Sequence, residues 1–188
     1  HIEVGAVTPR AQPGHPRPRI FRLPQHGALR NRMGFNNEGL EVIVRRLRGW
    51  QGRRRIKVGV NLGKNADTPL EQAGSDYQKV IDGCASVCDF YTLNVSSPNT
   101  EGLRSLSQVD QLEALLRQLR WSRPLWLKLS PDESMDTYRE IAARARDWGL
   151  EGVVFSNTTA RRDPPLDQVD ALGGISGRPL LQRNLDVL

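Results

Sequence analysis

The chain has 188 residues and a net charge of +6 at pH 7, and 38% of its residues are hydrophobic, an ordinary fraction for a folded domain. No apolar run approaches the ~20 residues that span a bilayer, which excludes a transmembrane helix within the sequence. Two cysteines, Cys84 and Cys88, are too few for a disulfide framework and fit small buried side chains in a reducing compartment.

The chain opens on a segment that is rich in proline. Residues 2–22 contain four prolines and few helix formers, which predicts a strand end, a loop and a short extended segment through Ile20 and Phe21. A helix is predicted over 36–50. The arginine run between residues 45 and 55 fits a solvated helix end better than a nucleic-acid surface, because no aromatic stacking pattern accompanies it. We therefore expect no nucleic-acid partner.

From residue 57 onward, strand and helix signals alternate. Short apolar runs predict four buried strands, at 57–62, 90–95, 124–129 and 152–155. Between them, apolar side chains recur at helical spacing on three segments: Ala73 to Cys84, Val109 to Leu119 and Met135 to Trp148.

The ends of these helices also carry sequence signals. Thr68 and Glu71 form a capping box, with Pro69 at the first helical position. Ser107 is expected to start the second helix, and Gly149 is expected to end the third.

Continuous apolar strands separated by amphipathic helices indicate a parallel sheet with βαβ crossovers. A repeat of about thirty residues fits a (β/α)8 TIM barrel as well as a doubly wound sheet. A Rossmann domain is disfavoured, because no G-x-G-x-x-G follows the first strand. We expect one α/β barrel domain over 1–188 with about five βα units. We expect it to be incomplete at both ends, because the chain begins on strand-like sequence and stops within a helix-like stretch.

Polar side chains lie at the carboxyl end of each predicted strand. The strands end in Asn61–Asn65, Asn94–Thr100, Lys128 and Ser156–Thr159. In a barrel the carboxyl ends of the strands form the active site, and asparagine is a poor strand residue unless it serves that rim. A ring of neutral amides with one cation suits a planar, hydrogen-bonding anion. A divalent metal is disfavoured, because no His or carboxylate cluster appears in the sequence.

The lysines support this interpretation. The chain contains 23 Arg and only 4 Lys, and Lys64 and Lys128 both lie in strand-end motifs. Lys128 is flanked by apolar residues, so we expect it to point into the barrel, where an ammonium needs an anionic partner. The glycine-rich stretch Gly173–Gly177 predicts a turn at a helix start. His15 and His26 lie in loops with no evident partner and receive no role.

These motifs together resemble a known family, the class 2 or quinone-linked dihydroorotate dehydrogenases, which are FMN enzymes of pyrimidine (UMP) biosynthesis built on a (β/α)8 barrel. Class 1 members carry Cys where Ser97 stands, so this residue favours class 2. The motifs occur in the family's order and span nearly the whole chain: Glu3–Arg10, Gln12–Gly14, Asn31–Asn37, Gly63–Asn65, Asn94–Thr100, Ser156–Thr159 and Gly173–Leu180.

The resemblance implies a role for individual residues. Ser97 would be the catalytic base that removes the C5 proton of dihydroorotate, with Thr100 and Phe35 shaping its surroundings. Dihydroorotate, or its product orotate, would be bound by Asn31, Arg32, Met33, Gly34, Phe35, Asn94, Asn99, Asn157 and Thr158. FMN would be contacted by Asn61, Asn94, Lys128, Ser156 and Gly177.

The resemblance also implies partners outside these residues. Quinone would be the final electron acceptor, and a segment before His1 would attach the protein peripherally to the cytoplasmic side of a membrane. Further barrel units would grip the FMN phosphate. Two positions depart from the family pattern. Ala6 replaces a flavin-contacting Thr that is frequent in bacterial members, and Glu101 replaces the usual Pro in a loop that we expect to be mobile.

Three alternatives stay open. The first is another FMN barrel, such as a class 1 dihydroorotate dehydrogenase or a dihydropyrimidine dehydrogenase domain, although Ser97 argues against both. The second is a basic nucleic-acid-binding module, but aromatics such as Tyr77 and Trp148 fall on predicted helix faces. The third is an inactive, truncated copy.

Overall fold

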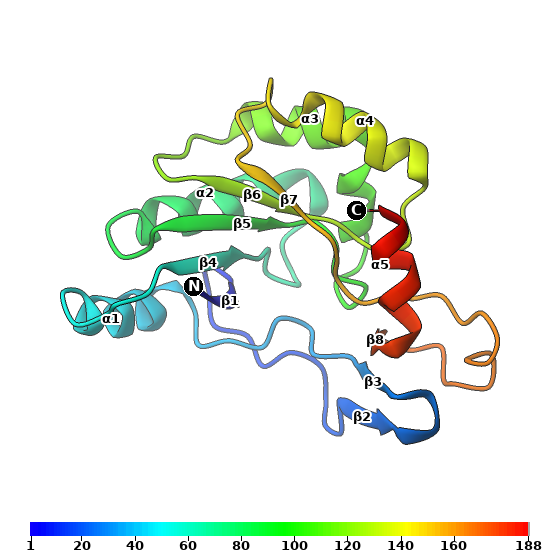
Figure 1. Cartoon of the computed structure of the whole chain (residues 1–188). Helices are drawn as coiled ribbons and strands as arrows, with labels where there is room; N and C mark the ends of the chain where they lie inside the picture. Colours follow the sequence, from blue (N-terminus) through cyan, green and yellow to red (C-terminus); the bar gives the residue numbers. More distant parts are fainter. Residues whose placement is uncertain (188) are drawn as a thin grey trace.

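The structure, a computed structural model, describes residues 1–187. Its centre is a sheet of five parallel strands in the order β1-β4-β5-β6-β7, with helices α2, α3 and α4 covering one face (Figure 1). The strands are Ile2–Val7, Val58–Leu62, Phe90–Asn94, Leu125–Lys128 and Gly152–Val154. The helices α1 to α5 are Leu40–Trp50, Ala73–Cys84, Val109–Gln118, Met135–Ala145 and Leu181–Val187.

This order of elements is part of a (β/α)8 barrel, as predicted, and all four apolar runs form the predicted strands. Within residues 1–187 the parallel sheet does not close on itself, because β1 and β7 are its two edges. None of the helices in this range has the length and apolar character needed to cross a bilayer.

A second, antiparallel sheet lies apart from the first. It pairs β2 (Ile20–Leu23) with β3 (Ala28–Asn31), and β3 with β8 (Gly174–Gly177) (Figure 1). The extended segment predicted at Ile20 and Phe21 is therefore confirmed. The glycine-rich turn predicted before the last helix was wrong: that stretch is strand β8, held by its pairing with β3 and by the fully buried side chain of Ile175.

The main core lies between the parallel sheet and helices α2 to α4. The sheet contributes fully buried side chains such as Val60, Leu93 and Leu127, and the helices contribute Tyr77 and Ile141. Strands covered in this way require continuous apolar character, which is why they could be identified from the sequence.

On the inner face of the sheet, glycines make room for aromatic rings of neighbouring strands. A Cβ at Gly59 would lie 2.1 Å from the ring of Phe90, and one at Gly152 would lie 2.4 Å from the ring of Trp126. The members of each pair are direct neighbours in the sheet. Such alternation of small and large residues fills the interior of small barrels.

Two predicted helix starts were wrong because other contacts define them. Helix α1 begins at Leu40, not at 36, because Gly39 adopts a φ of 83° and its N–H donates to the Asn37 side chain at 2.9 Å. Helix α3 begins at Val109, and the Ser107 hydroxyl donates to the Glu133 carboxylate at 2.6 Å instead of capping it.

The capping box before α2 was also wrong. A 3-10 turn, Leu70–Gln72, precedes the helix, Pro69 lies outside that turn, and no side chain caps either element. Helix α4 does have a side-chain cap, which the sequence analysis did not identify: Ser134 Oγ accepts from the N–H of Thr137 at 3.0 Å.

The crowding at Gly59 gives a test of the barrel interior. Gly59→Ala should lower the free energy of unfolding by about 1–3 kcal/mol, because its methyl group would overlap the Phe90 ring. Gly49→Ala is the matched control. Gly49 lies within α1 with open space around its Cβ position, so alanine should stabilise the helix by up to ~1 kcal/mol. Urea unfolding of both variants checks this, and equal effects would contradict the packing described.

Candidate active site

The carboxyl ends of the parallel strands converge on one small cavity of about 180 Å³. Because side chains alternate along a strand, Asn61, Asn94 and Lys128 all lie on the inner face, opposite the apolar core. The site residues predicted from the sequence that line this cavity are Asn31, Met33, Gly34, Phe35, Asn61, Asn94, Ser97, Asn99, Lys128, Asn157 and Thr158.

A larger hollow of about 650 Å³ shares Lys128, Asn157 and Thr158 with the small cavity. The two predicted FMN-contacting residues that do not line the small cavity, Ser156 and Gly177, line this hollow. The Ser156 hydroxyl donates to the Asn184 carboxamide at 2.8 Å. The predicted site is therefore a pair of hollows that meet at Lys128.

The amides of the small cavity hydrogen-bond to one another across strands β4 and β5. Asn61 Nδ2 donates to Glu3 Oε1 at 2.8 Å, and Asn94 Nδ2 donates to Asn61 Oδ1 at 3.0 Å. The second oxygen of Glu3 accepts a hydrogen bond from Thr92. Each carboxamide group uses one of its two N–H bonds in this way, so one N–H of Asn61 and one of Asn94 is left for a ligand with acceptor atoms.

The same network continues to the loop after β7. Ser96 Oγ donates to Asn94 Oδ1 at 2.9 Å, and Asn157 Nδ2 donates to Ser96 Oγ at 3.0 Å. The N–H of Thr158 then donates to Asn157 Oδ1 at 2.8 Å. Glu3 and Ser96, which received no role from the sequence, thus hold the predicted amides in place. The only sequence signal for Glu3 was a charged residue inside an otherwise apolar strand.

The two strand-end lysines differ in what they contact. Within residues 1–187, lysine ion pairs are formed by Lys57 and Lys79, so no carboxylate in this range neutralises Lys128 at the junction of the hollows. Lys64, in contrast, is turned away from both hollows. Its ammonium donates to the carbonyls of Asn65 at 2.9 Å and Thr68 at 2.6 Å.

Burial lowers the pKa of Lys64, and the nearby Asp76 carboxylate opposes that shift. The position of Lys64 in a strand-end motif therefore does not bring its ammonium to the candidate site. Its ammonium satisfies main-chain carbonyls of the loop after β4.

Ser97 lies in the tight turn that follows β5 and is only 5% exposed. Its Oγ accepts from the N–H of Asn99 at 3.2 Å. The Asn99 side chain reaches Asn31 Oδ1 at 3.3 Å, which joins this turn to the end of β3. The ring of His15 contacts the Asn99 carbonyl at 2.9 Å, so this histidine does have a partner, contrary to the sequence analysis. Thr100 is buried behind the turn and does not line either hollow.

The segment after β3 forms the other wall of the cavity in a left-handed turn. Gly34 has a φ of 70° and Phe35 a φ of 51°, which is unusual for a residue with a side chain. Arg32 does not share this placement: its guanidinium donates to the Pro18 carbonyl at 3.2 Å and lies outside the cavity. The structure therefore does not bring the Arg32 side chain to the predicted site.

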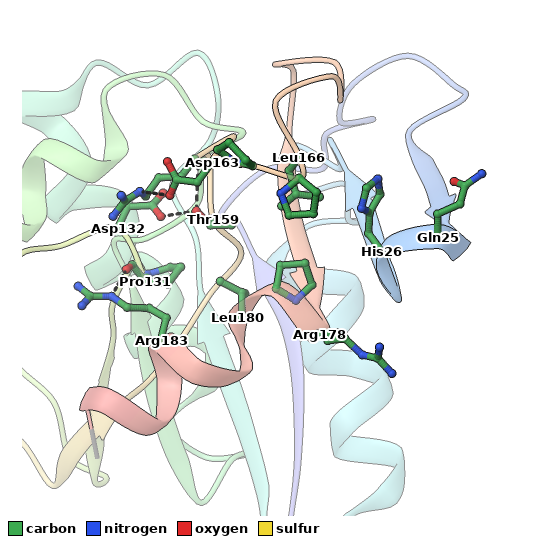
Figure 2. A pocket seen from close by; sticks show the side chains of 14 residues that line it. Gln25, His26, Pro131, Asp132, Thr159, Asp163, Leu166, Arg178, Leu180 and Arg183 are labelled. Atoms are coloured by element: carbon green, nitrogen blue, oxygen red, sulfur yellow. Dashed lines mark hydrogen bonds and ion pairs between the residues drawn. The ribbon is translucent and has the colours of Figure 1, made fainter.

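A further cavity of about 500 Å³ opens beside the loop that follows β7 (Figure 2). It is lined by residues from several loops, including Asp132, Thr159 and Leu166, and by Arg178 and Arg183. None of the residues predicted for substrate, cofactor or catalysis lines this cavity, so we place the candidate site in the two hollows at the strand ends.

The chain contains parallel βα units, and polar side chains gather at the carboxyl ends of their strands. This arrangement is typical of enzymes built on the (β/α)8 barrel. The family model described as dihydroorotate dehydrogenase matches residues 1–188. The chain belongs to the dihydroorotate dehydrogenase family.

Known relatives agree with this assignment. A protein of Roseiflexus castenholzii named dihydroorotate dehydrogenase (quinone) is 45% identical over 100% of this chain and 53% of its own length. A Burkholderia thailandensis protein of the same name is 44% identical over 100% of this chain and 57% of its own. The ligand-free DHODH of Eimeria tenella matches with a TM-score of 0.87 and 35% identity, over 98% of this chain and 59% of that one. The chain thus spans about half the length of the curated relatives it matches.

Proposed function

We propose that a protein carrying this chain oxidises (S)-dihydroorotate to orotate in pyrimidine biosynthesis, with FMN accepting the hydride and quinone as the final electron acceptor. The observation that carries the proposal is the cavity in which Ser97 and a ring of amides lie together with the Lys128 ammonium, which forms no ion pair with a carboxylate of residues 1–187. The family of the chain and the names of its relatives support the same activity.

The residues at the strand ends fit FMN. Lys128 lies where the hollows meet and can balance an anion, and Asn61 and Asn94 each keep an N–H for a ring acceptor. Ser156 and Gly177 would complete the contacts from the larger hollow. When bound, FMN supplies the hydride acceptor that no amino-acid side chain provides. The protein's part is to hold the ring and to favour its reduced, negatively charged form through Lys128.

The substrate would lie against the turns on either side of the small cavity. Asn31, Asn99, Asn157 and Thr158 offer neutral donors and acceptors to a planar pyrimidine, and Met33, Gly34 and Phe35 form the opposing wall. Arg32 would take part only through its main chain, because its side chain is bound to Pro18.

Ser97 would remove the C5 proton while a hydride leaves C6. A serine hydroxyl is a weak base at neutral pH, so it must pass on its own proton as it acts. We place that relay near the buried Thr100, through water. Pro98 restricts the backbone of Ser97, which helps to keep its Oγ at the cavity.

The intact protein would associate peripherally with the cytoplasmic side of a membrane through a segment outside this chain. The names of the quinone-type relatives support this proposal. None of residues 1–188 is assigned to the quinone.

Substitution of Ser97 tests the chemical step in a full-length, FMN-loaded protein that carries this sequence. Ser97→Ala should slow flavin reduction by dihydroorotate by roughly 10²- to 10⁴-fold, the usual contribution of a positioned base, while orotate affinity changes little. Ser97→Cys should restore part of the rate and move the pH profile to lower pH, because a thiol ionises more readily. Rapid mixing measures both, and an Ala variant within a few-fold of the parent would remove Ser97 from the mechanism.

The two lysines form a matched pair for testing the cofactor site. Lys128→Ala should weaken FMN binding and lower the flavin reduction potential, because the cation that stabilises the reduced anion is gone. Lys64→Met should instead lower the free energy of unfolding by about 1–3 kcal/mol, since two loop carbonyls lose their donor, with the potential unchanged. FMN titration, potentiometry and urea unfolding separate these outcomes. A reversed pattern would move the cofactor contact to Lys64.

The choice of electron acceptor tests the class of enzyme. The full-length protein should reduce a quinone analogue with dihydroorotate as donor and should use NAD and fumarate poorly. Steady-state assays with the three acceptors measure this, and a clear preference for NAD would be incompatible with the quinone-linked class.

A further inference from the structure

Arg104 contacts three different strand-end loops at once. Its Nε donates to the carbonyl of Ser96 at 3.1 Å, its Nη2 donates to the carbonyl of Thr158 at 2.8 Å, and its Nη1 meets the Asp132 carboxylate at 2.6 Å. These partners belong to the loops after β5, β7 and β6, respectively. One guanidinium therefore joins the ends of three neighbouring strands.

The carboxylate of Asp132 extends this junction. It also accepts hydrogen bonds from the Thr159 hydroxyl and, at 2.7 Å, from the N–H of Ala160. Figure 2 shows Asp132 beside Thr159, with Arg183 reaching the carbonyl of Pro131 from helix α5. The loop after β6 is thus held by hydrogen bonds from the loop after β7 and from helix α5. Arg104 connects this loop to the turn that carries Ser97.

Neither Arg104 nor Asp132 lines the small cavity or the larger hollow. Their influence on the site must pass through the main chain that they hold. The carbonyl of Ser96 is bonded to the main-chain nitrogen of Ser97, and the carbonyl of Thr158 belongs to a residue that itself lines the cavity next to Asn157. A shift of either carbonyl would move a side chain that faces the cavity.

The environment of Arg104 suits this task. Its side chain is 23% exposed and that of Asp132 is 16% exposed, so water competes only weakly for their hydrogen bonds. Arg104 lies in a short 3-10 helix, Leu103–Ser107, which is anchored by the buried side chains of Leu103 and Leu106. A planar guanidinium can present donors in three directions, whereas a lysine ammonium on a shorter, flexible stem cannot span the same partners.

We propose that Arg104 is a positioning residue that holds the Ser97 turn and the Asn157–Thr158 segment in register, so that these two segments of the cavity lining move as one unit. The link to catalysis rests on the proposed role of Ser97. The coupling of the two segments does not, because it follows from the hydrogen bonds alone.

The test compares Arg104→Ala and Arg104→Lys with the parent in the full-length, FMN-loaded protein. Arg139→Ala is the matched control, because Arg139 is 73% exposed and its one ion pair within residues 1–187 is with Asp136 on its own helix. Hydrogen exchange is followed in segments 96–100 and 157–160, and in helix α2 as an internal reference. Rapid mixing follows flavin reduction by dihydroorotate.

Both Arg104 variants should exchange about tenfold or more faster in the two segments together, with α2 unchanged, because the loss is local. Flavin reduction should slow by roughly 10- to 100-fold, the cost of a small misplacement of a reacting group, with FMN content retained. The Arg139 control should match the parent in both measurements. If Arg104→Ala does not fold, Arg104→Lys decides the question, because it keeps the charge.

Parent-like exchange in both segments of the Arg104→Lys variant, or faster exchange in one segment alone, would overturn the inference. Faster exchange in α2 to the same degree would also overturn it, because the residue would then be a general stabiliser. If the parent itself does not reduce its flavin with dihydroorotate, the proposed function fails, and the exchange data still decide whether Arg104 couples the two segments.

Discussion

The hydrogen-bonded chain that runs from Glu3 to Thr158 is the constraint on which the rest of the cavity depends. Parallel strands bring their carboxyl ends to one edge, so polar side chains placed there become buried together. A buried amide without partners costs about 1–3 kcal/mol, and here Asn61, Asn94 and Asn157 satisfy one another instead. The Glu3 carboxylate at one end of this series of hydrogen bonds can only accept, and the Thr158 N–H at the other end can only donate. The donor and acceptor roles of every group between them are therefore fixed, and so are the atoms that each amide presents to a ligand.

Two lysines near the carboxyl ends of strands in the same sheet, Lys64 after β4 and Lys128 in β6, show how this constraint separates structure from function. Lys64 is satisfied by main-chain carbonyls, and nothing in its surroundings calls for another molecule. Lys128 lines the space between the amides, and no carboxylate in the described part of the chain pairs with it. The position in sequence is similar, but the hydrogen bonds available to each ammonium are different. A strand-end cation therefore indicates a ligand only when the fold leaves it without a partner.

The sequence predicted the strands and the apolar helix faces well, because continuous or periodic hydrophobicity reflects burial directly. The ends of the predicted strands also indicated cavity residues such as Asn61, Asn94 and Lys128, whereas Asn31 and Met33 to Phe35 were named only through the family resemblance. The sequence could not predict contacts between distant segments. Glu3 beneath Asn61, His15 on the Asn99 carbonyl and Arg32 on Pro18 all depend on the path of the chain in space. The predicted helix starts were wrong for the same reason. The Ser107 hydroxyl donates to the carboxylate of Glu133, which lies in another loop, and does not cap helix α3.

The pairing of β3 with β8 has a consequence for how the molecule is made. These strands come from opposite ends of the chain, yet β3 ends at Asn31, which lines the small cavity, and β8 ends at Gly177, which lines the larger hollow. Contacts between segments so far apart form late, because a long loop must close before they can contribute. During synthesis, the parallel strands and their helices can assemble as they emerge, whereas the walls of the site come together only after the residues of β8 have left the ribosome.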